Sequence, residues 1–211
     1  MTRNTRTYAR TAGILYLVTH ITSITAVAAY AADAPTVGVA LELVLAAGCL
    51  GTGILLWVLL RNIGPARAAA FAGLRALEAA VIAAGTLPML ALTWMTASAP
   101  VVESFNALHT AAFLVGQGLV ISVNTVILGW LLLGARVVPR ALAVLGIVGG
   151  TLVLVGNLAQ LFGLIPQGGT IAALSAVPIF AFEIWFAIYL IAVGLQPRYA
   201  ASSPTVRAME S

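Results

Sequence analysis

Apolar residues form six long runs along the chain, and short polar breaks separate the runs. Hydropathy in windows of about 19 residues places the runs at residues 11–31, 37–60, 68–92, 107–133, 140–163 and 171–195. Each run is long enough for an α-helix to cross a hydrocarbon layer roughly 30 Å thick. The pattern predicts an all-α polytopic membrane protein, with tails at 1–10 and 196–211 around a compact bundle of six transmembrane helices.

Composition excludes the soluble classes of protein. The chain has 211 residues, of which 62% are hydrophobic and 8% are charged, against roughly 25% charged residues in soluble domains. A water-exposed surface needs more charge than this, and a disordered chain needs less hydrophobicity. All ten basic residues are arginines, and they are scattered, so we expect the lipid bilayer as a partner and no nucleic acid. Cys49 is the single cysteine and offers neither a disulfide nor a zinc motif.

The arginines predict the orientation of the bundle. Nine of the ten lie before the first run, in alternate loops or after the last run: Arg3, Arg6, Arg10, Arg61, Arg67, Arg136, Arg140, Arg198 and Arg207. The intervening loops hold Asp33 and Glu103 and no basic residue. Because positive loops stay inside, we expect both termini in the cytoplasm.

The first run also resembles a secretory signal, because arginines precede it and Ala29-Tyr-Ala31 fits an A-x-A cleavage site. Thr19 and His20 interrupt the apolar core that a signal needs, so we favour a permanent span. Small residues group on the other runs, with Gly146 and Gly150 forming a GxxxG motif. Such residues let helices approach closely, which predicts tight packing and allows a homodimer through the fifth helix.

Ten polar or ionisable residues fall inside the predicted spans: His20, Glu42, Arg75, Glu78, His109, Gln117, Asn124, Asn157, Gln160 and Glu183. An ionisable side chain near the bilayer centre costs about 2.5 to 3.5 kcal/mol, so we expect each to face the bundle interior and a partner. At about 1.5 Å of rise per residue, His20, Glu78 and Glu183 come near the middle, and Glu42, Asn157 and His109 lie towards the outside. Arg75 and Glu78 are three residues apart and can pair within one helix.

Three hypotheses follow from these residues. The first is a protein that binds or transports a small polar or cationic ligand or protons, with seven candidate residues: His20, Glu42, Arg75, Glu78, His109, Asn157 and Glu183. The second is a structural or partner-binding membrane protein whose buried polar residues only fix helix packing. The third is an intramembrane enzyme that acts on a lipid-like substrate through a metal held by His20, Glu42 and Glu183. A haem between His20 and His109 has weaker support, because roughly two helical turns separate their predicted depths.

Several intramembrane motifs carry a resemblance to a known family: Ala12-Gly-Ile-Leu-Tyr-Leu-Val-Thr-His20, Leu41-Glu42-Leu43, Arg75-Ala-Leu-Glu78, Val138-Pro-Arg140, Leu145-Gly-Ile-Val-Gly-Gly150, and Pro178 with Glu183. From about Arg10 to Leu195 the chain resembles the DUF4386 family, small bacterial integral-membrane proteins of unknown function. The resemblance implies a six-helix fold in the bacterial plasma (inner) membrane and no mechanism. The family often shows His-Asp-Trp in the fourth helix, whereas Thr110 and Ala111 follow His109 here.

Overall fold

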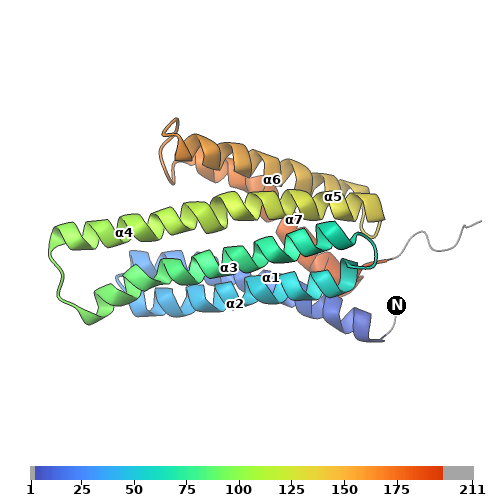
Figure 1. Cartoon of the computed structure of the whole chain (residues 1–211), viewed down its shortest axis with the longest axis horizontal. Helices are drawn as coiled ribbons and strands as arrows, with labels where there is room; N and C mark the ends of the chain where they lie inside the picture. The colour runs from blue at the N-terminus through green and yellow to red at the C-terminus, as the bar shows by residue number, and fades with distance from the viewer. Residues whose placement is uncertain (1–2, 197–211) are drawn as a thin grey trace, which may run out of the picture.

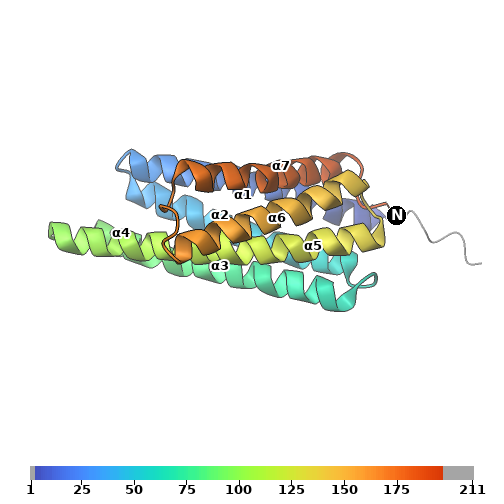
Figure 2. The same cartoon turned by 90° about the horizontal axis from the view of Figure 1, so that it is seen from above.

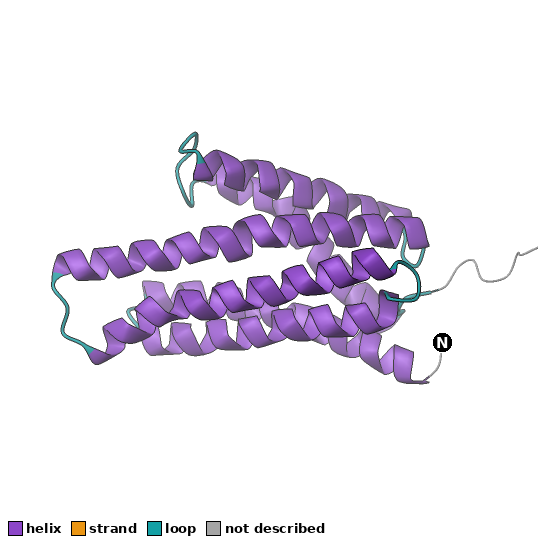
Figure 3. Cartoon of the chain, viewed as in Figure 1, coloured by secondary structure: helices purple, strands orange, loops and turns teal. Residues whose placement is uncertain are grey.

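The computed structural model describes residues 3–196, and helices are the only regular secondary structure within this range (Figure 3). The elements are α1 (Arg3–Ala31), α2 (Pro35–Leu60), α3 (Pro65–Trp94), α4 (Ala99–Phe113), the π-helix η1 (Leu114–Val120), α5 (Ile121–Ala135), α6 (Arg140–Leu161) and α7 (Thr170–Ala192). Since α4, η1 and α5 run on without a break, the described residues form six helices that are long and apolar enough to span a membrane. The predicted fold class is thereby confirmed.

Two helices begin earlier than the hydropathy pattern indicates. The fourth span starts at Ala99 instead of residue 107, because Pro100 occupies the first helical turn, where a missing N–H costs nothing. α1 starts at Arg3 instead of residue 11, so the arginines before the apolar run belong to the helix. Hydropathy marks the apolar part of a helix and not its ends. The last arginines, Arg198 and Arg207, lie outside the described residues.

The six spans form a closed ring. Each span packs on the next one along the chain, and α1 packs on α7 (Figures 1 and 2). Both ends of the described chain lie at the same end of the bundle (Figure 1). There the Arg10 side chain donates to the carbonyl of Ile191 at 3.3 Å, and the Gln196 N–H donates to Val137 at 3.1 Å.

We call this end the arginine end, because it carries all the described arginines outside the membrane interior: Arg3, Arg6, Arg10, Arg61, Arg67, Arg136 and Arg140. The loops at the opposite end carry no basic residue; Asp33 lies in the α1–α2 loop, and Glu103 lies near the start of α4. The positive-inside rule uses such a separation of charge to predict how a protein is oriented in its membrane.

The main hydrophobic core fills the half of the ring nearest the arginine end. Its fully buried side chains include Tyr16, Leu56, Phe71, Leu132 and Phe186. The rings of Tyr16 and Phe186 meet edge to face, with centroids 5.7 Å apart, an arrangement that aromatic pairs prefer. Side chains from all six spans therefore close this half of the ring.

The glycines of α6 serve contacts within the chain. A Cβ atom at Gly146 would lie 2.8 Å from the Phe182 ring, and one at Gly150 would lie 2.8 Å from the Val126 side chain. The GxxxG motif thus faces α7 and α5, where it allows close packing. A homodimer stays an untested prediction, and these two glycines already have neighbours of their own.

Candidate functional site

Each of the three glutamates inside the membrane faces a basic side chain. Glu78 pairs with Arg75 within α3, whereas Glu183 faces His20 and Glu42 faces His109 across helices. The sequence predicts the Arg75–Glu78 pair and leaves the other two glutamates free. The structure gives both of them a histidine, so no membrane-embedded carboxylate among the described residues lacks a cationic or titratable neighbour.

The Arg75–Glu78 pair is fully enclosed. One terminal nitrogen of Arg75 donates to both carboxylate oxygens of Glu78, at 2.8 and 3.0 Å, and the Arg75 Nε donates to Thr52 at 3.2 Å. The Asn124 amide donates to Glu78 at 2.8 Å. The guanidinium also lies over the Tyr16 ring, 5.1 Å from its centroid, where a cation is attracted by the ring face. With side chains 2% and 1% exposed, this pair has no open side for a ligand.

His20 and Glu183 form a looser pair near the middle of the bundle. Their Nε2 and Oε2 atoms are 3.3 Å apart. His20 Nε2 is buried and makes no hydrogen bond with the described residues. Its ring meets Phe180 edge to face at 4.9 Å, which fixes the ring plane.

His109 and Glu42 form the third pair, nearer the end opposite the arginines. His109 Nε2 lies 2.9 and 3.0 Å from the two oxygens of Glu42, and the Tyr30 hydroxyl donates to the same carboxylate at 2.8 Å. Glu42 is buried, while the His109 side chain is 18% exposed. The carboxylate partner of His109 comes from α2, so the absence of an acidic residue directly after His109 does not prevent a dyad.

A hollow of about 520 Å³ opens beside His109. Its polar lining comes from α4, η1, α6, the α6–α7 loop and α7: His109, Thr110, Gln117, Asn157, Gln160, Gln167 and Ser175. Val27, Leu114 and Val153 supply part of the apolar lining. We call it the amide cavity. Pockets that bind small molecules have this size and this mixture of apolar walls and a few polar groups.

The π-helix η1 borders this cavity. Within it, Gln117 accepts a hydrogen bond from the Ser23 hydroxyl of α1 at 3.0 Å, and a Cβ atom at Gly118 would lie 2.5 Å from the Asn157 side chain. η1 therefore joins α1 to α6 around the cavity. Single π-helical turns inside α-helices occur often at functional sites, and hydropathy does not detect them.

The seven predicted site residues divide between two places. His109 and Asn157 line the amide cavity. Glu42 does not line it but contacts His109. The other four, His20, Arg75, Glu78 and Glu183, lie outside its lining. The metal candidates His20, Glu42 and Glu183 belong to two different pairs, and no group of three ligating side chains gathers anywhere in residues 3–196. Each histidine faces a carboxylate, so the arrangement offers no support for a haem between them.

Sequence reasoning missed several partners of the ionisable residues. Tyr30 looks like part of a cleavage motif, and Tyr16 and Thr52 look like ordinary packing residues. The structure places the first against Glu42 and the other two against Arg75. A tyrosine or threonine inside an apolar run gives no sign of its partner, because the partner comes from another helix.

Six apolar spans around paired intramembrane charges define a polytopic membrane protein with an ionisable interior. The family model described as "Domain of unknown function (DUF4386)" matches residues 11–194, and the chain belongs to this family. The resemblance inferred from the intramembrane motifs is thus confirmed. Comparisons with curated proteins and with solved structures gave no match.

Proposed function

We propose that the protein binds a small, neutral polar ligand in the amide cavity and that the His109–Glu42 pair exchanges a proton with that cavity. One observation carries the proposal: His109 lines the cavity and at the same time contacts both oxygens of a buried carboxylate. Ionisable residues inside a membrane are expensive to bury and commonly mark such sites.

The chemistry of the lining favours a neutral ligand over a cation. Glu42, Glu78 and Glu183 already have basic partners, so none of them is free to hold a cation. The carboxamides of Gln117, Asn157, Gln160 and Gln167 can each donate and accept hydrogen bonds. A cavity that combines these carboxamides with apolar walls suits a compact molecule with an apolar body and one amide-like or hydroxyl group.

The histidine provides the route for a proton. An ionised carboxylate only accepts hydrogen bonds, so with Glu42 ionised the proton between the two groups lies on His109 Nε2. The other ring nitrogen can then accept or release a second proton. The pair can therefore change its charge when the cavity fills or empties.

Infrared difference spectroscopy tests the proton exchange directly. The carboxyl bands of Glu42 and Glu78 are assigned by their absence in Glu42→Gln and Glu78→Gln. We expect the Glu42 band to change with the bulk pH as His109 gains or loses a proton, and the Glu78 band to stay constant. A Glu42 band as insensitive to pH as that of Glu78 would contradict the proposal.

A cysteine variant tests access to the cavity. Ala176 lines it, whereas Ala187 is fully buried in the core, so Ala176→Cys should react with a small water-soluble thiol reagent and Ala187→Cys should not. The native Cys49 is 1% exposed and serves as an internal control. If Ala176→Cys reacts as little as Ala187→Cys, the cavity is not open to water.

Three probes with one apolar body test the ligand class. Benzamide, benzylamine and benzoate differ mainly in the charge of the polar group. We expect benzamide to slow the labelling of Ala176→Cys more than either ion at the same concentration. Stronger protection by benzylamine would indicate a cationic ligand, and stronger protection by benzoate an anionic one; either result contradicts a neutral ligand.

We further propose that the arginine end faces the cytoplasm and that the protein lies in the bacterial plasma (inner) membrane with both termini inside. The distribution of the arginines between the two ends supports this orientation. An impermeant thiol reagent should then label Ala176→Cys in intact cells and fail to label it in inverted vesicles. The reverse result would place the arginine end outside.

A further inference from the structure

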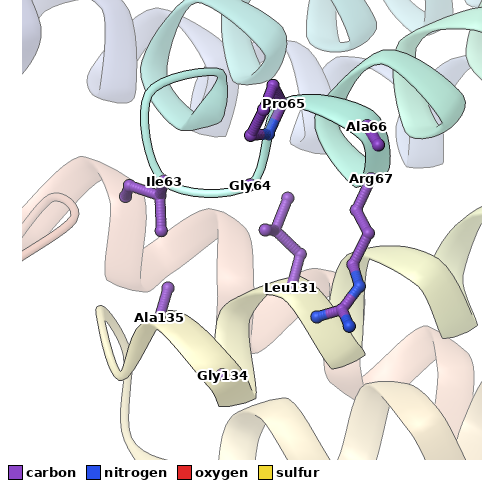
Figure 4. A pocket seen from close by; sticks show the side chains of 8 residues that line it. All are labelled: Ile63, Gly64, Pro65, Ala66, Arg67, Leu131, Gly134 and Ala135. Atoms are coloured by element: carbon purple, nitrogen blue, oxygen red, sulfur yellow. The ribbon is translucent and has the colours of Figure 1, made fainter.

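A second hollow lies at the arginine end, far from the amide cavity. It has a volume of about 450 Å³ and lies between the α2–α3 loop, the first turn of α3 and the last turns of α5. Figure 4 shows Arg67 reaching from α3 towards α5 at one side of the hollow, Ile63 and Ala135 at the other side, and Leu131 between them. We call this hollow the Arg67 groove.

The cation in the groove is unpaired. Arg67 is exposed and makes no hydrogen bond or ion pair within residues 3–196. In contrast, the neighbouring Arg61 stacks over Trp57, with its guanidinium carbon 5.1 Å from the ring centroid. The acidic residues Asp33 and Glu103 lie next to the loops of the opposite end. No described acidic side chain at this end competes for Arg67.

The rest of the groove is apolar and closely built. A Cβ atom at Gly64 would lie 2.6 Å from the Leu131 side chain, so the loop lies directly against α5. A Cβ atom at Gly134 would lie 3.7 Å from an Arg67 nitrogen and near no other atom. The absence of a side chain at Gly134 therefore leaves the space in front of the guanidinium open.

We propose that the Arg67 groove binds the headgroup of an anionic phospholipid, with the lipid phosphate on Arg67 and the adjoining glycerol and upper acyl chain against Ile63 and Leu131. The groove lies where α5 ends at Ala135 and α3 begins at Pro65, which is the level of lipid headgroups if the spans cross the bilayer. An arginine beside apolar side chains matches the two parts of a lipid at this level. Basic pockets between transmembrane helices are known to select anionic headgroups.

Native mass spectrometry of the full chain, taken from nanodiscs of equal parts phosphatidylglycerol and phosphatidylcholine, tests the proposal. We expect the wild type to retain phosphatidylglycerol preferentially. Arg67→Gln should lower that preference about fivefold, because it removes the charge-assisted hydrogen bonds that the groove offers to the lipid phosphate. Arg61→Gln removes the same charge at the same end and should leave the preference unchanged.

Two further measurements separate the groove from general surface charge and from simple anion binding. Gly134→Leu fills the groove without changing charge, so it should lower the preference as well; full retention by this variant would overturn the proposal. Equal losses in Arg67→Gln and Arg61→Gln would also overturn it. Displacement of the lipid by inorganic phosphate would show a site for free anions and would exclude the lipid as the specific occupant.

Discussion

The two halves of the helix ring are built differently although the same six spans form both. Towards the arginine end, apolar side chains such as Leu56, Phe71, Leu132 and Phe186 are at most 1% exposed and close the ring. Towards the opposite end the helices leave space for the amide cavity, and His109 stays partly exposed. The Arg75–Glu78 pair resembles the closed half, because protein side chains surround it on every side.

The difference shows that an ionisable residue inside a membrane is not by itself a binding site. Arg75 and Glu78 are costly to bury, yet their contacts with each other and with Thr52 and Asn124 leave no group free for a ligand. Glu42 has similar burial but reaches a cavity through His109. Contact with a cavity therefore distinguishes the Glu42–His109 pair, for which we propose a binding role, from the enclosed Arg75–Glu78 pair.

We expect the largest loss of stability when the Arg75–Glu78 pair is broken. Glu78→Gln leaves the Arg75 guanidinium buried without its counter-ion, and we expect it to lower the free energy of unfolding by about 3 to 5 kcal/mol, measured by denaturant titration in detergent micelles. Glu103→Gln changes an exposed acid and should stay within about 0.5 kcal/mol of wild type. Replacing both members, Arg75→Met with Glu78→Leu, should recover most of the loss. Similar values for the two glutamate variants would contradict a structural role for the pair.

Alanine substitutions at two glycines of α6 test whether the helices pack more tightly in the middle of the ring than beside the cavity. Gly149→Ala places a Cβ atom 2.7 Å from the backbone nitrogen of Ile179 and should cost about 1 to 3 kcal/mol of unfolding free energy. Gly156→Ala meets only the Ser175 side chain, with Oγ at 2.8 Å and Cβ at 3.3 Å. The hydroxyl can rotate towards the cavity, so the cost of this substitution should be smaller. Gly73→Ala meets nothing within 4 Å and should be neutral or stabilising. Equal costs at the two α6 positions would mean that the cavity half is as tightly packed as the rest.

A smaller effect is expected for the Tyr30 hydroxyl. Tyr30→Phe removes one hydrogen bond to Glu42 and should lower the free energy of unfolding by about 1 kcal/mol, while the infrared band of Glu42 shifts. Tyr8→Phe alters an exposed tyrosine in the first turns of α1 and should change neither quantity. An unshifted Glu42 band in Tyr30→Phe would show that the hydroxyl does not bind the carboxylate in the membrane.

Most of the fold could be predicted from the sequence, because the bilayer dictates both the length and the composition of a span. Six spans follow directly from hydropathy. The extension of the fourth span to Ala99 and the π-helix at Leu114–Val120 could not be predicted. The first depends on a proline at a helix start, and the second depends on packing against α1 and α6.

The site could be predicted only as a set of candidates. Depth counting put Glu42 and His109 towards the same side, and the structure brings them into contact. It could not show which helix faces carry them, because that depends on how the spans are rotated within the ring. The amide cavity is less predictable still, because the space beside Gln117 and Gln160 depends on how α1, α4, η1, α6 and α7 are arranged around it.

The smallest effect on stability, and the sharpest test of the cavity, is expected for Asn157→Leu. The Asn157 amide donates to the Val153 carbonyl at 2.8 Å and accepts from Gln160 at 3.2 Å, both within its own helix, so its loss should change the free energy of unfolding by about 1 kcal/mol at most. The leucine side chain should fill part of the amide cavity and replace a polar group, which slows the labelling of Ala176→Cys several-fold. Thr151→Leu, on an exposed face of the same helix, should leave the labelling rate unchanged. If Ala176→Cys reacts at the same rate with either leucine substitution as without it, the cavity does not control access to α7. The structural difference between the two halves of the ring would then have no bearing on function.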